Sequence, residues 1–399
     1  MKSPLNYLRK IPFSSAVFLL YILVAVITTL QGVLGHLKSF EHSDQIYTSY
    51  NNYIIFRNSF FHLIHGKNLY TLYLNEQWDL YKYSPSFSLL MGILAYLPDF
   101  IGLLSWNLLN SIPILIGFRY LHGVKERNKC FALLFCLMEL SNNMQNSQSN
   151  GLMAGLIILT FTSLENKNYF TASLWVVLSV YLKIYGGIAF VFFLFYPSKW
   201  KLLRYTVFWF VIVGALPLLA ISLHQLLYLY QAWWGLLKAD QTINDGISVA
   251  GILHSWFNMS LSKNIISFSG LVLFLLPFLR SNKYKDYHFR LLILCSALIW
   301  IVIFNHKAES PTYIIALLGV SLWYFTGERT GLNTALFILT LIFTTLSVSD
   351  LVPGSVRDNF VVPYCIKAVM PIIIWIIISI ELLFRNSFVF VITESPDIS

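Results

Sequence analysis

Long apolar segments recur along the chain and are separated by polar connections. A helix needs roughly 20 apolar residues to cross the roughly 30 Å hydrocarbon core of a bilayer. The segments that approach this length are 13–35, 84–98, 100–118, 130–142, 151–164, 169–195, 204–223, 264–280, 291–304, 311–326, 331–348 and 364–385. Because several are short, we expect a bundle of about 10 to 12 transmembrane helices. The pattern predicts an all-α polytopic membrane protein that forms a single integral membrane domain over residues 1–399.

A polar and aromatic loop of 48 residues, 36–83, separates the first two apolar segments. Within it, apolar and small residues recur at helical spacing: Ile54, Ile55, Phe56, Ser59, Phe60, Leu63 and Ile64. Arg57, Asn58 and His62 lie mostly on the opposite side, and Gly66 can end the helix. We therefore expect an amphipathic helix in the membrane interface, where a lipid-borne substrate presents its polar end.

The positions of Lys and Arg predict the orientation in the membrane. With both termini in the cytoplasm, the connections 196–203, 281–290 and 327–330 are basic and face inside. The loops 36–83, 224–263, 305–310 and 349–363 then face outside. One basic patch lies outside in this scheme: Arg119, Lys125, Arg127 and Lys129. Either a segment between 84 and 164 does not cross fully, or this patch faces out for a purpose. A bacterial inner membrane is the expected location.

The composition agrees with a membrane protein, since 57% of the residues are hydrophobic and 11% are charged, against about 25% charged in soluble domains. The net charge of +9 comes from cations that flank the spans, so nucleic acid is not expected as a partner. Four cysteines lie in or next to apolar segments and suit small buried side chains better than disulfides: Cys130, Cys136, Cys295 and Cys365. Neither a cofactor nor a metal is predicted.

The loop 36–83 contains groups suited to sugar transfer. Its acids are Glu41, Asp44, Glu76 and Asp79, and its cations are Lys38, Arg57, Lys67 and Lys82. Transfer with inversion needs a carboxylate that takes the proton of the acceptor hydroxyl. It also needs positive charge that stabilises a leaving phosphate. A solvated loop with ordinary surface charges explains the same residues.

Two polar features interrupt the apolar segments. The amide-rich stretch 142–151 contains Gln148 and Asn150, and it predicts either a wet cavity or a tight polar connection, because unpaired amides are costly in a membrane. Lys183 lies near the middle of the predicted span 169–195. Such a lysine either pairs with a substrate phosphate or extends to the inner face.

Two outer loops carry further candidates. Segment 305–311 holds His306, Lys307 and Glu309, which together can bind an anion and move a proton, although a solvated turn with an internal ion pair is the alternative. The loop 224–263 combines tryptophans with amides and carboxylates. These side chains suit either sugar stacking or an aromatic belt at the membrane surface.

Several short motifs together resemble glycosyltransferase family 87, a branch of the GT-C superfamily that uses polyprenyl-phosphate mannose. They are Gly66–Tyr70, Tyr81-Lys-Tyr83-Ser-Pro85, Leu97-Pro98, Ser147-Gln148-Ser149-Asn150, Leu182-Lys183, Asp240-Gln241-Thr-Ile-Asn244-Asp-Gly246 and His254. The stretch Ser147-Gln148-Ser149-Asn150 resembles the family pattern Gly-Gln-x-Asn, with Ser147 in place of the Gly. The resemblance covers roughly residues 50–330.

The resemblance implies a GT-C-like membrane bundle. It also implies inverting transfer of a hexose, usually mannose, from a polyprenyl phosphate to a glycan or glycolipid acceptor on the outer face of the bilayer. The family's acidic base falls on Asn52, and an amide cannot accept that proton as a carboxylate does. We expect Asp44 to take the role, with His306 or Glu309 as alternatives.

The other expected roles follow from the same resemblance and the charges. The cationic or titratable candidates for binding the donor are Arg57, Lys82, Lys183, His306 and Lys307. The residues that would orient the sugar or the loop by hydrogen bonds are Asn52, Gln148 and Asn150. A polar-lipid transporter and a non-catalytic partner in envelope glycan synthesis are the alternative functions, the second because of Asn52.

Overall fold

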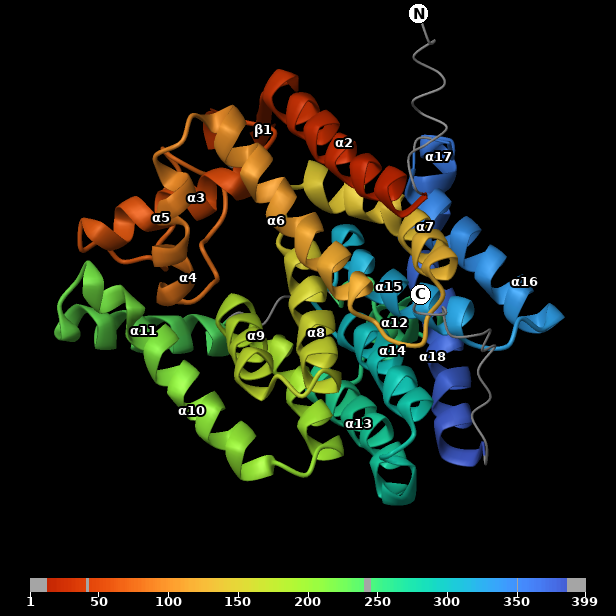
Figure 1. Cartoon of the computed structure of the whole chain (residues 1–399). Helices are drawn as coiled ribbons and strands as arrows, with labels where there is room; N and C mark the ends of the chain where they lie inside the picture. Colours follow the sequence, from red (N-terminus) through yellow and green to blue (C-terminus); the bar gives the residue numbers. More distant parts are fainter. Residues whose placement is uncertain (1–12, 41–42, 240–244, 350, 386–399) are drawn as a thin grey trace, which may run out of the picture. The chain divides into compact units, whose positions relative to one another are not determined.

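The structure is a computed structural model, and it describes residues 13–40, 43–239, 245–349 and 351–385 (Figure 1). Five helices in this part are long and apolar enough to cross a membrane: Ser14–Leu34, Asp99–Arg119, Lys199–Leu219, Gly331–Val348 and Ile366–Phe384. Shorter apolar helices lie between them. The prediction of an all-α polytopic membrane protein is confirmed, and the chain is an integral membrane protein.

The chain divides into two compact units. Unit 1 comprises Met1–Leu23, Phe118–Glu139 and Asn244–Ser399, and unit 2 comprises Val24–Gly117 and Leu140–Ile243. Three helices contribute residues to both units: α2 (Phe13–Leu34), α6 (Asp99–Arg119) and α7 (Glu126–Gln145). We describe each unit by itself.

Unit 2 contains a short antiparallel hairpin and several helices. The hairpin pairs β1 (Lys38–Phe40) with β2 (Ser43–Tyr47). The helices are α3 (Asn51–Ile64), α4 (Pro85–Leu90), α5 (Gly92–Ala95), α8 (Asn150–Glu165), α9 (Tyr169–Leu182), the 3-10 helix η1 (Ile184–Phe195), α10 (Lys199–Ala215), η2 (Leu216–Leu219) and α11 (Leu223–Ala239). Helix α8 is apolar on every side and buried along most of its length, as expected for a central helix.

Helix α3 is the helix predicted within the loop 36–83. It ends at Ile64, and Gly66 follows in the left-handed region with φ 68°, which glycine adopts without strain. Helix α3 packs against α4 and α5 (Figure 1), and most of its apolar residues are buried. His62, which we predicted to lie mostly on the side opposite the apolar residues, is also buried. The helix therefore packs into unit 2 on more than one side.

The predicted span 169–195 is not one continuous α-helix. Helix α9 ends at Leu182, Lys183 is extended at φ −148° and ψ 129°, and η1 begins at Ile184. Gly186 allows this break because a Cβ there would lie 2.6 Å from the carbonyl oxygen of Ser179. The Ser179 hydroxyl also donates to the Gly186 carbonyl at 3.1 Å. Lys183 consequently lies at a helix junction instead of the middle of a helix.

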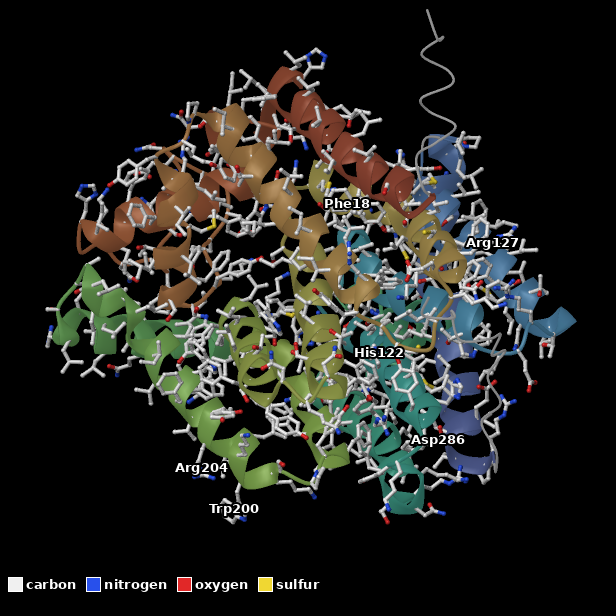
Figure 2. The ribbon with its side chains drawn as sticks, in the orientation of Figure 1. Phe18, His122, Arg127, Trp200, Arg204 and Asp286 are labelled. Carbon is white, nitrogen blue, oxygen red and sulfur yellow. The ribbon has the colours of Figure 1, made fainter. Side chains whose placement is uncertain are left out.

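The start of α10 has the character of a membrane-interface segment. Trp200 and Arg204 project outward from its first turns (Figure 2), and Trp200 is 78% exposed. Tryptophans and cations of this kind anchor helix ends at the lipid head groups. The arrangement is consistent with the basic connection 196–203 predicted at the inner face.

Unit 1 is built around three helices that pack against one another, α14 (Tyr287–Ile303), α15 (Tyr313–Thr326) and α18 (Ile366–Phe384). The other helices of the unit are α12 (Val249–Phe257), α13 (Lys263–Leu275), η3 (Leu276–Leu279), η4 (Ser281–Lys283), η5 (Ser310–Thr312), α16 (Gly331–Thr340), η6 (Leu341–Thr345), η7 (Leu346–Val348), α17 (Gly354–Val356) and η8 (Arg357–Val361). Nearly every residue of α14 and α15 is buried.

Candidate functional site

The polar connection between α7 and α8 in unit 2 begins with a tight turn. Ser147 is in the left-handed region at φ 50°. Its N–H donates to the carbonyl of Met144 at 2.8 Å, and the N–H of Gln148 donates to that of Asn143 at 3.0 Å. These bonds satisfy carbonyl groups at the end of α7. Glycine suits such a residue best, which explains why the resembling family pattern has Gly where this chain has Ser147.

Buried amides hold this turn in place. The Asn143 side-chain amide donates to Asn110 Oδ1 at 3.1 Å, while its oxygen accepts from the Asn150 N–H at 3.2 Å. Asn110 Oδ1 also accepts from the N–H of Leu152 at 3.1 Å. Asn110, Asn143 and Asn150 are fully buried. These amides are paired within the protein, as the tight polar connection would require.

Lys183 joins this connection from the junction of α9 and η1. Its Nζ donates to Asn150 Oδ1 at 2.9 Å, and the Asn150 amide donates to Gln148 Oε1 at 2.7 Å. The ammonium lies 5.7 Å from the ring centres of both Tyr83 and Tyr185, close enough for cation–π attraction. The structure therefore brings three predicted residues together, Gln148, Asn150 and Lys183.

Tyr83 belongs to the same site, although the sequence analysis assigns it no role of its own. Its hydroxyl and that of Ser149 are 2.9 Å apart. Ser84 caps α4 by accepting from the Phe87 N–H at 3.1 Å, and its hydroxyl donates to the Tyr181 carbonyl at 2.6 Å. The N-cap serine followed by Pro85 is a typical helix start. This cap connects the loop before α4 to the end of α9.

Asn52 also contacts the turn, because its side-chain amide donates to the Asn146 carbonyl at 2.8 Å. Arg57 forms an ion pair with Asp99, and Lys82 forms one with Asp79 at 3.3 Å. Both predicted cations thus have carboxylate partners in unit 2. The backbone of Asp44 lies in β2, but its side chain is outside the described part of the chain, so its role stays a prediction.

Burial shifts the pKa of two groups of α3, Tyr50 at its N-cap and His62 within it. Burial and the hydrogen bond donated to Asp99 Oδ2 at 2.9 Å raise the pKa of Tyr50 to about 12, so this hydroxyl stays a donor at neutral pH. Burial lowers the pKa of His62, although Glu76 at 2.8 Å opposes the shift. His62 therefore favours its neutral form.

Unit 1 carries the other predicted group, His306, Lys307 and Glu309. They occupy the turn between α14 and η5, as the sequence predicts. The Lys307 N–H donates to Asn305 Oδ1 at 3.0 Å, and the Ala308 carbonyl accepts from the N–H of Ile247 at 2.8 Å. This contact fixes the turn against the segment that begins after Asp245.

The segment against this turn contains an Asp–His pair. Asp245 Oδ2 is 2.7 Å from His254 Nδ1, and Lys263 lies 3.4 Å from the other carboxylate oxygen. Gly246, at φ 61°, lies so close to the turn that a Cβ would be 2.5 Å from the His306 carbonyl oxygen. The motif residues Asp240, Gln241 and Asn244 lie outside the described residues.

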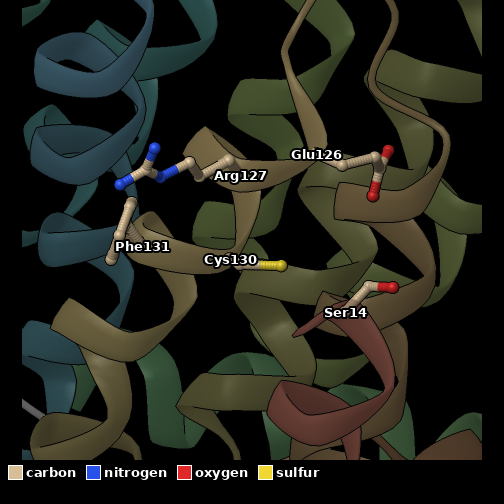
Figure 3. A pocket seen from close by; sticks show the side chains of 5 residues that line it. All are labelled: Ser14, Glu126, Arg127, Cys130 and Phe131. Atoms are coloured by element: carbon tan, nitrogen blue, oxygen red, sulfur yellow. The ribbon is translucent and has the colours of Figure 1, made fainter. Parts of the chain in front are cut away.

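Unit 1 also has a surface pocket of about 500 Å³, lined by Ser14, Glu126, Arg127, Cys130 and Phe131 (Figure 3). It contains none of the predicted site residues. The Arg127 guanidinium lies 5.4 Å from the Phe131 ring centre. Lys129, another cation of the predicted basic patch, is buried and donates to the Arg119 carbonyl at 3.1 Å and to Glu126 at 2.8 Å. The Lys129 charge is therefore used within the fold.

The fold and these sites define an integral membrane protein with a half-buried lysine, amides and aromatic rings at a helix junction. Residues 81–349, more than half of the chain, match the family model of glycosyltransferase family 87. The chain belongs to this family, and it is a membrane glycosyltransferase. A search of curated proteins finds no match.

Proposed function

We propose that this enzyme transfers a hexose, with mannose favoured, from a polyprenyl phosphate to a glycan or lipid acceptor. Family membership supports the reaction class. The observation that carries the donor assignment is Lys183, a half-buried ammonium bonded to Asn150 and placed between two tyrosine rings. A lysine among apolar helices is costly unless it serves an anionic partner.

The chemistry assigns a role to each part of this site. As the bond between the anomeric carbon and the phosphate oxygen breaks, negative charge grows on the phosphate, and the Lys183 ammonium stabilises it. Tyr83 offers a ring face to the sugar, and Gln148 offers its amide group to the sugar hydroxyls. The buried Asn150 orients both Gln148 and Lys183 through its hydrogen bonds. Asn52 steadies the turn through Asn146.

Inversion requires that the acceptor hydroxyl attack from the side opposite the phosphate and lose its proton to a base. Asp44 is our candidate, because the carboxylate it carries can accept a proton and the amide of Asn52 cannot. His306, Lys307 and Glu309 in unit 1 are further candidates for proton transfer and phosphate binding. Arg57 and Lys82 are weaker candidates for the donor, since each is already paired with a carboxylate.

The enzyme would work at the outer face of a bacterial inner membrane, with both termini in the cytoplasm and a GT-C-like arrangement of spans. The basic connections 196–203, 281–290 and 327–330 support this orientation. The outer face is where a lipid-phosphate sugar and an envelope glycan would meet.

The test incubates the purified protein with polyprenyl-phosphate mannose and a membrane extract that supplies acceptor. We expect release of polyprenyl phosphate together with labelled glycan. Lys183→Met should lower the rate at least tenfold by removing the charge opposite the phosphate. Lys199→Met, at the exposed start of α10, is the matched control and should keep the wild-type rate.

Two other results would count against a transferase, and a third would count only against the choice of Asp44 as the base. The break between α9 and η1 resembles the discontinuous helices of transporters, so reconstituted vesicles that move the lipid without sugar transfer would favour a transporter. Activity that requires a separate active transferase would favour a non-catalytic partner. Asp44→Asn at the wild-type rate would remove Asp44 as the base.

A further inference from the structure

A buried ion pair lies in unit 1. Lys367 Nζ, on α18, is 2.7 Å from Glu139 Oε1, on α7, and the two side chains are 1% and 2% exposed. Removing two charges from water carries a large desolvation penalty. Apolar residues of similar volume are often as stabilising as such a pair. The pair therefore calls for an explanation other than stability.

Besides the ion pair, the Lys367 ammonium makes two further contacts. It donates to the Ser310 hydroxyl at 3.0 Å and lies 5.3 Å from the ring centre of Tyr313. An ammonium has three hydrogens to donate, and Lys367 directs one to each of two partners, Glu139 and Ser310. It thereby joins α7 and α18 to the start of α15.

Ser310 is the last residue of the turn that holds His306 and Lys307. The same turn is fixed on its other side by the segment after Asp245. Tyr313 donates its hydroxyl to the Ile247 carbonyl at 2.8 Å, and the Ile247 N–H donates to the Ala308 carbonyl at 2.8 Å. The turn 305–310 is therefore held at two places. Lys367 bonds to Ser310 at its end, and the Ile247 N–H bonds to the Ala308 carbonyl within it.

We propose that Lys367 is a positioning residue: held by Glu139, it fixes Ser310 and so the orientation of the 305–310 turn. His306 and Lys307 then meet the donor phosphate in one arrangement. This inference rests on the proposed function, which gives the turn its role in phosphate binding. An apolar replacement of the pair could maintain packing, but it could not direct a hydrogen bond to Ser310.

The first experiment removes the contact to the turn and leaves the ion pair intact. Ser310→Ala should speed hydrogen exchange in residues 304–312 and lower kcat roughly tenfold, because a hydrogen bond to a charged group is lost. Ser310→Thr keeps the hydroxyl and should restore both values. The control is Ser321→Ala in α15, which removes a hydroxyl that donates to the Leu318 carbonyl at 3.0 Å and accepts from the Cys136 thiol at 3.5 Å. It should match the wild type in kcat and in the exchange of residues 304–312.

The second experiment separates positioning from folding. Glu139→Leu combined with Lys367→Met removes both charges, so neither is left buried alone, and the protein should unfold within a few degrees of the wild type. The double variant should nevertheless show the fast exchange and low kcat of Ser310→Ala. Wild-type exchange and kinetics in this variant, or in Ser310→Ala, would overturn the proposal.

The exchange measurement keeps this inference distinct from the proposed function. If the wild-type protein transfers no sugar but residues 304–312 loosen in both variants, the proposed function fails and the positioning by Lys367 stands. If the wild type transfers sugar and both variants match it in kcat and exchange, the proposed function stands and the positioning role fails.

Discussion

At the scale of single residues, the candidate donor site depends on the hydrogen bonds that Asn150 makes with Lys183 and Gln148. Lys183, Gln148 and Asn150 stand out because charged and amide side chains are rare between apolar segments, and the structure joins them. Asn110 could not be found in the same way. It lies within a predicted span, and its role depends on Asn143, which is distant in the sequence.

The left-handed conformation of Ser147 predicts a stabilising substitution. A residue with a Cβ pays roughly 1–2 kcal/mol in this region, and glycine offsets part of that gain through its freer unfolded chain. Ser147→Gly should therefore raise the free energy of unfolding by roughly 0.5–1 kcal/mol, measured by thermal unfolding in detergent. Ser149, at φ −97°, is the control, and Ser149→Gly should bring no gain.

The lowered pKa of His62 predicts a pH dependence of stability. In the window between its folded pKa and the unfolded value of about 6.5, the unfolded chain binds more protons than the folded protein. Stability should fall as the pH is lowered from 7.5 through 6.5 and level off below the folded pKa. The groups that act on His62 are Glu76, Lys67 and His65.

The pH prediction is checked by thermal unfolding of wild type and His62→Gln between pH 5 and pH 8. Other titrating groups affect both proteins, so the difference between the two curves isolates His62. The wild-type curve should be the steeper one below pH 6.5. Parallel curves would show that His62 does not contribute.

At the scale of elements, the sequence predicts where helices form, but it does not predict that the helix over 169–195 is interrupted at Lys183. Helix α3 and the turn 305–310 lie where the apolar spacing and charges place them. The break after Leu182 was missed, because residues 169–195 are almost uniformly apolar and a hydropathy pattern does not distinguish one helix from two. Only the approach of Gly186 to Ser179 shows the reason.

Two adjacent glycines test whether this break positions Lys183. A Cβ on Gly186 would lie 2.6 Å from the Ser179 carbonyl oxygen, while a Cβ on Gly187 would have no neighbour closer than 3.7 Å. Gly186→Ala should destabilise the protein by about 1–3 kcal/mol through overpacking and should lower transferase activity. Gly187→Ala should resemble the wild type in both thermal unfolding and activity. Equal effects of the two substitutions would contradict the proposed importance of the break.

At the scale of the whole molecule, the sequence predicts the membrane class, and the match over residues 81–349 identifies the family. The number of full crossings was harder to predict, since among the described residues five helices are long enough by themselves and the other apolar helices are shorter. Short apolar helices do not reveal from length alone whether they cross, pair end to end or stay buried. Sidedness therefore needs a direct measurement.

Cysteine labelling can provide that measurement, because the four native cysteines are all buried. Asn75→Cys and Glu309→Cys place a thiol at exposed residues of loops predicted to face outside, and Lys285→Cys places one in a predicted inner connection. A membrane-impermeant maleimide should label the first two in intact cells and Lys285→Cys only after permeabilisation. The wild-type protein, whose four cysteines are buried, gives the background labelling. Labelling of Asn75→Cys and Glu309→Cys from opposite sides would mean that the two groups of candidate residues cannot act on one donor phosphate, and the roles proposed for His306 and Lys307 would fall.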